Sequence, residues 1–144
     1  MTEGRQVPII LVDDDPDEHF LFQADLGDAG LEMDFHAFTR GDAALEFLEA
    51  RGPAGPVLVL TDLSIPGGDA ADFIRKALPH LDGGSIGVFS GAKNPDVEAE
   101  CRDAGSSFYI VKPIKLDKIE AIVADLPGMR IQPGEAGKVR LVSG

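Results

Sequence analysis

The sequence predicts one α/β domain in which five helices cover both faces of a five-stranded, parallel, doubly wound sheet. Its 144 residues suit a single compact domain with a core of its own. Short apolar segments alternate with segments whose apolar residues recur at helical spacing, which is the pattern of βα units around a parallel sheet. No internal repeat or low-complexity block interrupts this alternation.

Five segments are expected to form the strands. Residues 7–12 and 56–61 are almost continuously apolar, as central strands covered by helices on both faces must be. Residues 31–38 ("LEMDFHAF") alternate apolar and polar side chains, which is typical of an edge strand that shows one side to water. Residues 85–89 and 108–111 complete the set.

The helices are expected between and after these strands, where the apolar residues take helical spacing. The five apolar stripes are Phe22, Leu26 and Ala29; Ala44, Phe47 and Leu48; Phe73, Ile74, Ala77 and Leu78; Val97, Cys101 and Ala104; and Ile119, Ile122, Val123 and Leu126. Asn94 before Pro95 is typical of a helix start, and Gly30 and Gly105 stand where a left-handed residue would end a helix. The helix after Asp69 is expected to be short.

Composition narrows the class of partner and the compartment. A formal net charge of −12 argues against nucleic acid or an anionic membrane as the main partner. The single cysteine, Cys101, allows no internal disulfide and is expected in the core. The first ten residues lack the pattern of a secretion signal, so cytoplasmic residence is expected. His19, His36 and His80 show no metal-binding spacing and are expected at the surface or partly packed.

Chemically active side chains follow four of the five expected strands. Asp13 and Asp14 come after the first strand, Asp62 after the third, Ser90 after the fourth and Lys112 after the fifth. A doubly wound sheet binds its ligands outside the carboxyl ends of its strands, so these residues are expected at one rim.

This set of side chains suits phosphoryl chemistry. Crowded carboxylates repel at neutral pH and need protons or a cation, and hard oxygen ligands suit Mg²⁺. An aspartate beside such a metal can attack a phosphoryl group and become an aspartyl phosphate, while a lysine and a hydroxyl hold the phosphoryl oxygens.

The acidic run at residues 13–18 has two readings. All five acids could start a helix on a solvated face, which is the ordinary reading of "DDDPDE" alone. The groups at the other strand ends favour a division of roles: Asp13 and Asp14 bind the metal, Asp15 caps the helix, and Asp17 and Glu18 face its positive end.

The segments "IILVDDD", "VLVLTDLSIPGGD", "IGVFS" and "GSSFYIVKP" resemble, in order and spacing, the motifs of two-component response-regulator receiver domains. The resemblance covers about residues 7–126 and implies the flavodoxin-like strand order 2-1-3-4-5. It also implies that Asp13, Asp14 and the backbone carbonyl of Ser64 bind Mg²⁺ beside Asp62. Asp62 would accept the phosphoryl group from a histidine kinase or a histidine phosphotransfer protein.

The same resemblance gives roles to residues near the last two strands. Ser90 matches the switching hydroxyl, Lys112 the phosphoryl-binding lysine and Tyr109 the aromatic residue whose rotamer follows the hydroxyl, although Tyr109 alone could simply pack. The bond before Pro113 is expected to be cis. Ala70 stands where the family usually has glycine, which leaves the shape of that loop open.

The expected function is that of a stand-alone receiver, formed by residues 1–127, that signals through an unknown downstream protein. It is not expected to be an enzyme: the reactions that it catalyses would be its own phosphorylation and autodephosphorylation. The fourth helix, fifth strand and fifth helix are the expected output surface, and a homodimer stays open.

A phosphate-independent interaction module is one alternative function. A small Mg²⁺-dependent phosphatase is another, but it lacks a second acid two residues after Asp62. Flavin binding is disfavoured, because no hydroxyl- and glycine-rich phosphate loop follows the first strand.

Residues 128–144 lie outside the resemblance. Three cations, Arg130, Lys138 and Arg140, against Glu135 give this segment a net charge of +2 on an acidic chain. Two alternating stretches flank the turn formers "PGEAG", which favours a hairpin or arm that contacts the domain or a second chain. A disordered end is the alternative.

Overall fold

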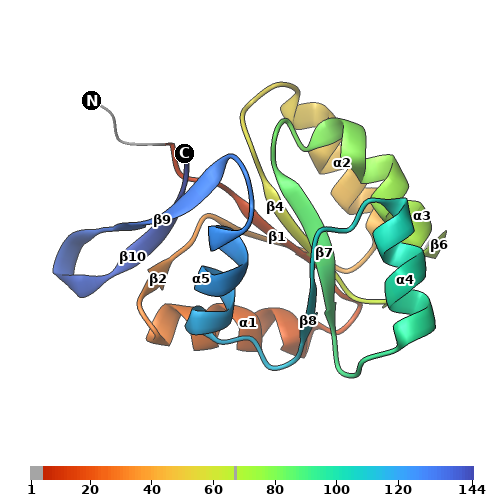
Figure 1. The fold of residues 1–144 in the computed structure, drawn as a ribbon, viewed down its shortest axis with the longest axis horizontal. Coiled ribbons are helices and arrows are strands. Elements are labelled where there is room, and N and C mark those ends of the chain that lie inside the picture. Colours follow the sequence, from red (N-terminus) through yellow and green to blue (C-terminus); the bar gives the residue numbers. More distant parts are fainter. Residues whose placement is uncertain (1–4, 67) are drawn as a thin grey trace.

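The computed structural model describes residues 5–66 and 68–144 and has a parallel five-stranded sheet at its centre (Figure 1). The sheet order is β3-β1-β4-β7-β8, with every neighbouring pair parallel. The strands are β1 (Ile9–Val12), β3 (Phe35–Phe38), β4 (Leu58–Thr61), β7 (Ser85–Ser90) and β8 (Tyr109–Val111). Numbered within this sheet alone, the order is 2-1-3-4-5, so the predicted fold class and strand order are confirmed.

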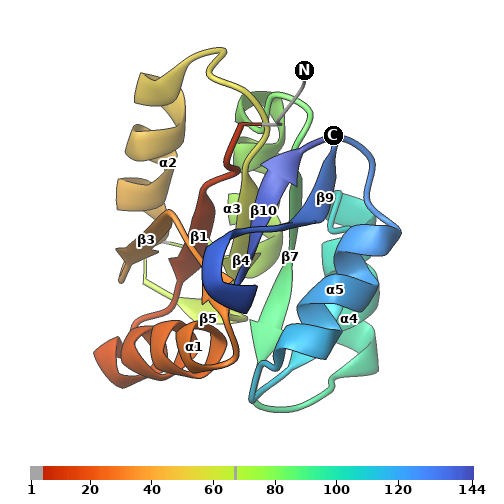
Figure 2. The ribbon, with the colours of Figure 1, turned by 90° about the vertical axis from the view of Figure 1, so that its left-hand side faces the viewer.

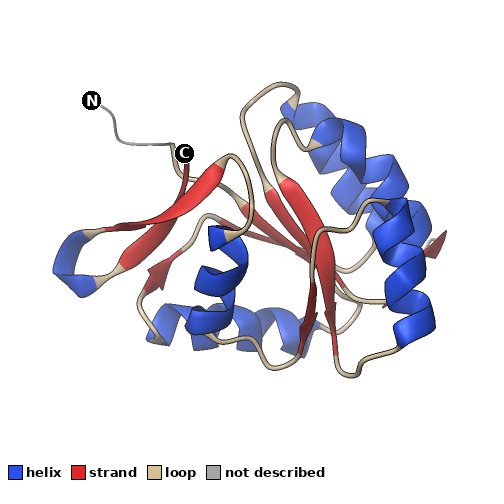
Figure 3. Ribbon diagram, viewed as in Figure 1, coloured by secondary structure: helices blue, strands red, loops and turns tan. Residues whose placement is uncertain are grey.

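Five helices cover the two faces of this sheet (Figure 3). They are α1 (Pro16–Asp28), α2 (Gly41–Arg51), α3 (Ala70–Ala77), α4 (Pro95–Ala104) and α5 (Leu116–Ala124). Alternate residues of the central strands enter two apolar clusters. In β1, Ile10 and Val12 pack with α2, α3 and α4, whereas Ile9 and Leu11 pack with α1 and α5. The central strands are buried on both faces, which explains their continuous apolar sequence.

The predicted helix ends are largely confirmed. The Asp15 side chain accepts a hydrogen bond from the Asp17 N–H at the start of α1, and Asn94 caps α4 in the same way. Gly105 ends α4 with a φ of 122°, a conformation that favours glycine. Helix α3 is short, as predicted, with eight residues before a 3₁₀ turn, η1 (Leu78–His80). No helix within the described ranges is both long and apolar enough to cross a membrane.

The chain after Asp62 forms a small antiparallel hairpin, β5 (Ser64–Ile65) and β6 (Gly68–Asp69), before α3. Gly67 between these strands lies outside the described residues, as do residues 1–4 of the expected domain. Ala70 is buried as the first residue of α3, and Asp69 caps this helix through the N–H of Asp72 (2.7 Å).

The expected edge strand at residues 31–38 is wrong in part. Only β3 joins the edge of the large sheet, whereas β2 (Leu31–Glu32) belongs to a separate three-stranded sheet. The chain changes sheets at residues 33–34 because β2 pairs with a strand from the far end of the sequence, β10 (Val139–Ser143). The predicted stripe of α1 is also corrected, since Ala29 is exposed at the helix end.

Residues 129–143 form an ordered hairpin that packs on the domain. β9 (Met129–Pro133) and β10 are antiparallel and joined through η2 (Glu135–Gly137), and β10 lies between β9 and β2 (Figure 1). Figure 2 shows β9 beside α5. The N–H of Val7 donates to the carbonyl of Leu141 (2.9 Å). Leu141 and Met129 are buried in the apolar cluster that α1 and α5 share. The hairpin therefore enlarges the core on one face of the large sheet.

Candidate functional site

Three carboxylates meet at the carboxyl end of the large sheet. One side-chain oxygen from each of Asp13, Asp14 and Asp62 lies within 4.8 Å of the other two. The topology causes this proximity: Asp13 follows β1 and Asp62 follows β4, and these strands are parallel neighbours. The N–H of Asp62 donates to the carbonyl of Val12 (2.9 Å), which continues the strand ladder up to the site.

Asp13 is the most tightly held of the three acids, at 1% exposure. Its Oδ2 lies 2.8 Å from the Nζ of Lys112, and its Oδ1 accepts a hydrogen bond from the N–H of Asp15 (3.0 Å). Asp14 is exposed. The site therefore has one fixed, buried carboxylate and one that is open to a ligand.

Asp62 is partly buried, so its exposure lies between that of Asp13 and that of Asp14. Its Oδ1 accepts a hydrogen bond from the N–H of Leu63 (2.9 Å), and the Thr61 hydroxyl donates to its backbone carbonyl (2.9 Å). Burial raises the pKa of the Asp62 carboxyl, the positive charge of Lys112 opposes this shift, and the negative charge of Asp13 adds to it. A raised pKa means that the site favours the neutral form of this carboxyl more than water does, chiefly because the group is partly buried.

Lys112 supplies the positive charge of the site. Burial by itself would lower the pKa of Lys112, but the hydrogen bond to Asp13 and the charges of Asp62, Asp13 and Glu18 outweigh burial and raise it. Its Nζ also lies 3.6 Å from a carboxylate oxygen of Glu18. The bond to Pro113 is cis, as the resemblance implied.

The acidic cluster suits a divalent cation. Three hard oxygen donors at short separation repel one another, and one lysine leaves net negative charge, so a small cation such as Mg²⁺ fits the donor set. Ser64 lies in β5, two residues after Asp62. The contribution of its carbonyl to a metal stays a prediction.

Ser90 and Tyr109 lie near this site on the neighbouring strands. Ser90 ends β7 and is buried, and its backbone carbonyl accepts a hydrogen bond from the N–H of Lys112 (2.8 Å). Tyr109 begins β8, and its hydroxyl donates to the carbonyl of Ala92, two residues after Ser90. The Nζ of Lys93 lies 5.8 Å from the centre of the Tyr109 ring. The switch roles of Ser90 and Tyr109 stay predictions.

Comparison with known families agrees with this geometry. The family model described as "Response regulator receiver domain" matches residues 9–124. The chain belongs to this family.

Named relatives share the receiver fold. "Two-component response regulator ORR1" from Oryza sativa subsp. japonica is 29% identical in an alignment of 130 residues, which covers 85% of this chain and 56% of the relative. This chain therefore spans just over half the length of that relative. A receiver domain from Rhodospirillum rubrum is 25% identical with a TM-score of 0.67, covering 81% of this chain and 88% of the other. The Mn²⁺-bound form of response regulator Rcp1 is 25% identical with a TM-score of 0.61, covering 79% and 86%.

The site of this receiver includes one residue that the sequence did not indicate. His19 was expected at the surface or partly packed, but the residue is buried at 8% exposure and its Nε2 lies 2.7 Å from the backbone carbonyl of Asp13. The helical spacing of His19, Phe22 and Leu26 was the available signal. His36 and His80 are only partly buried, beside Asp34 and Glu49 respectively, whereas Cys101 is buried in the core as predicted.

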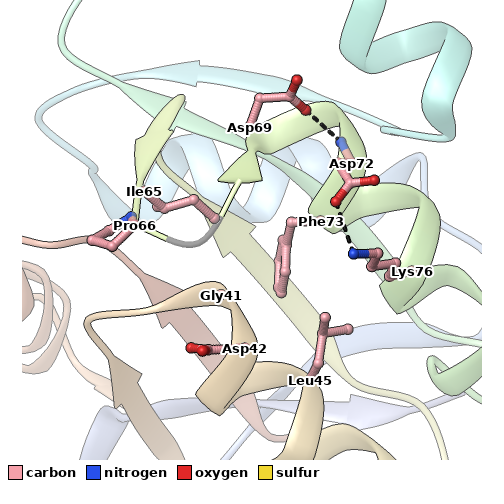
Figure 4. A pocket seen from close by; sticks show the side chains of 9 residues that line it. All are labelled: Gly41, Asp42, Leu45, Ile65, Pro66, Asp69, Asp72, Phe73 and Lys76. Carbon is pink, nitrogen blue, oxygen red and sulfur yellow. Dashed lines mark hydrogen bonds and ion pairs between the residues drawn. The ribbon is translucent and has the colours of Figure 1, made fainter.

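Two hollows of the receiver differ in size and position. The first, between α2, α3 and the β5–β6 hairpin, holds about 60 Å³. Figure 4 shows Phe73 and Leu45 among its lining side chains and Lys76 paired with Asp72. A volume of this order suits a water molecule or two rather than a metabolite. The second holds about 320 Å³ between α1 and the chain after β8, and Lys112, Phe89 and Leu21 are among its lining residues.

Proposed function

We propose that this receiver accepts a phosphoryl group on Asp62 from a phosphohistidine of a histidine kinase or a histidine phosphotransfer protein, with Mg²⁺ as its cofactor. The observation that carries the proposal is the convergence of Asp13, Asp14 and Asp62, with Lys112 hydrogen-bonded to Asp13. The Mn²⁺-bound form of Rcp1, a relative with the same fold, supports the binding of a divalent cation. Asp13, Asp14, Asp62 and the Ser64 carbonyl would hold the ion.

The transfer uses Asp62 as the nucleophile. One carboxylate oxygen of Asp62 forms a bond to phosphorus while the phosphorus–nitrogen bond of the donor breaks. The electron pair of the broken bond stays on the imidazole nitrogen. The donor histidine is left as a neutral imidazole, either directly or after it takes a proton from solvent. The Leu63 N–H holds Oδ1, so Oδ2 is the oxygen left to react. When bound, Mg²⁺ neutralises the charge on the carboxylates and on the transferring group. Lys112 and the Ser90 hydroxyl donate hydrogen bonds to phosphoryl oxygens.

A protein phosphodonor has an apolar surface to dock on beside this site. Phe20 and Leu21 of α1 are 72% and 49% exposed, and Leu21 also lines the 320 Å³ hollow next to Lys112 and Pro113. Large aromatic and aliphatic side chains in the open are typical of protein interaction sites. We place the phosphodonor over α1 and the chain that follows β8.

The output is a binding event and not turnover of a substrate. New charge on Asp62 draws the Ser90 hydroxyl toward the phosphoryl group, and Tyr109 moves into the space that this opens. The surface of α4, β8 and α5 changes as a result and is offered to a downstream protein. The only reactions of the receiver are its own phosphorylation and autodephosphorylation.

The alternatives have weaker support. A phosphatase of this kind would need a second acid two residues after Asp62, but Ser64 stands at that position. A phosphate-independent interaction module would not need the acid set and Lys112, yet all of them are present and converge.

The test is the intact mass of the protein after incubation with Mg²⁺ and acetyl phosphate. We expect the wild type and the control Asp103→Asn, which changes an exposed acid of α4, to gain one phosphoryl group. Asp62→Asn and chelator-treated wild type should gain none. Equal uptake by Asp62→Asn or by metal-free protein would overturn the proposal.

A further inference from the structure

His19 is a buried polar residue in a position that an apolar residue would ordinarily fill. It shares the inward stripe of α1 with Phe22 and Leu26, and the residue is 8% exposed. Its Nδ1 is buried with no hydrogen-bond partner among the residues that the structure describes. Burying such a ring on a helix that leucine would suit needs a compensating interaction.

The compensating interaction is the hydrogen bond to the backbone of Asp13. A carbonyl oxygen only accepts, so the His19 Nε2–H donates to it over 2.7 Å. Within residues 5–66 and 68–144, no other donor is hydrogen-bonded to this carbonyl, and the nearby N–H of Asp15 donates to the Asp13 side chain. His19 thus satisfies a buried carbonyl where the chain turns from β1 into α1.

This contact fixes the peptide unit between the two metal acids. The Asp13 carbonyl and the Asp14 N–H belong to one planar group, so holding the oxygen sets the backbone angles on both sides. Asp13 has further anchors in Phe38, Asp15 and Lys112. Asp14 is exposed, and no side-chain hydrogen bond to it is formed by the rest of the described chain, so its direction depends on that peptide unit.

We propose that His19 is a positioning residue of the cation site: it orients the Asp13–Asp14 peptide so that both carboxylates face the ion that Asp62 shares. This inference rests on the proposed function. It gives His19, a buried residue of α1, a role in orienting the metal ligands at the rim, without contact between the His19 ring and the ion.

The experiment is a calorimetric Mg²⁺ titration of the full chain, run well below the melting temperature of every variant. Loss of a hydrogen bond that orients metal ligands typically weakens metal affinity by about 10–100-fold, and we expect His19→Leu to show a loss of that order. His19→Gln, which keeps an N–H donor, should recover a large part of it. If His19→Leu does not fold, His19→Met removes the donor with a more adaptable side chain.

Two controls separate positioning from general destabilisation. Leu26→Ala changes the same stripe of α1 without touching the Asp13 carbonyl and should keep wild-type Mg²⁺ affinity. His36→Leu removes a histidine from β3 and should do the same. A second readout needs no metal: the amide of Asp15, which bonds to Asp13 Oδ1, should exchange its hydrogen faster in His19→Leu than in Leu26→Ala.

The outcomes are distinct. Wild-type affinity in His19→Leu, an equal loss in Leu26→Ala, or no recovery in His19→Gln would each overturn the positioning role while leaving the proposed function intact. Wild-type protein that binds no Mg²⁺ would overturn the proposed function and this inference with it.

Discussion

The Nζ of Lys112 lies 2.8 Å from Oδ2 of Asp13, which is 1% exposed. Lys112→Ala would leave that carboxylate buried with one hydrogen bond, from Asp15. A buried charged group that loses a partner costs about 1–3 kcal/mol or more. We expect a loss of this order in the free energy of unfolding, measured with urea in chelator, and a smaller loss in Mg²⁺. Lys118→Ala, an exposed change on α5, is the control and should be near neutral. An equal loss in the two buffers would contradict this account.

Asp62 should make stability depend on pH in the opposite sense to an ordinary paired carboxylate. Burial raises its pKa above 3.8, so the folded protein binds this proton more tightly than the unfolded chain does. The stability that this proton contributes is fully present below pH 3.8 and is lost as the pH rises through the folded pKa. In chelator, Asp62→Asn should therefore stabilise the protein at pH 7, with a gain that shrinks toward pH 3.5. Urea unfolding at both values checks this, with Glu120→Gln as the exposed control; a less stable Asp62→Asn at pH 7 would refute it.

Ser90→Ala should uncouple phosphorylation from the surface around Tyr109. Tyr109 is the single tyrosine and the chain has no tryptophan, so tyrosine fluorescence reports on this residue alone. We expect phosphorylation to change that fluorescence in the wild type and in Ser85→Ala, which alters a buried serine at the other end of β7. In Ser90→Ala the change should be lost, along with the change in amide exchange at β8. A wild-type response in Ser90→Ala would show that the coupling takes another route.

Phe20→Ala should slow phosphoryl transfer from a protein donor and leave transfer from acetyl phosphate unchanged. Truncating a central apolar contact typically costs at least about 1 kcal/mol of binding, or roughly fivefold. Single-turnover transfer from a purified kinase or phosphotransfer protein that phosphorylates the wild type measures this effect. Leu78→Ala, another exposed apolar residue (40%), lies in η1 and should have no effect. Equal slowing with both donors would place the effect in the site itself.

Leu141→Ala should destabilise the domain while Asp62 still takes up phosphate. Leu141 is 1% exposed and its loss leaves a cavity between the hairpin and the domain, for which the typical cost is about 2–5 kcal/mol. The melting temperature should fall, whereas Lys138→Ala, on the exposed part of the hairpin, should change little. Truncation after Pro127 removes all of β9 and β10 and should destabilise more. Unchanged melting after truncation would mean that the hairpin adds nothing to the core.

The sequence was sufficient to predict the position of a residue where the local pattern and the sheet topology agree. The positions of Asp13, Asp62 and Lys112 at strand ends follow from the βα alternation, because parallel strands must all end at one rim. The family resemblance added roles that spacing alone does not supply, such as those of Ser64 and Tyr109, which still await a test.

Features that depend on distant partners were not predictable in the same way. The break between β2 and β3 exists because β10 pairs with Leu31 and Glu32. The alternation of apolar and polar residues at 31–38 does not predict a pairing with a strand so far along the chain. His19 looked like a surface histidine because burial depends on which side of α1 meets β1. The preference of Lys112 for Asp13 over Asp62 is a choice among rotamers that only the packed site settles.

The place of β10 also affects how the chain reaches its folded state. β10 is synthesised after every other strand described here, yet it is the middle strand of its sheet and covers Val7 and Leu31, which are among the first core residues to be made. Until β10 pairs with β2 and with the chain at Val7, the apolar side chains in this region stay exposed to water. The folding chain therefore exposes apolar surface until the β9–β10 hairpin packs on the domain, and partly folded states of this kind are prone to aggregate.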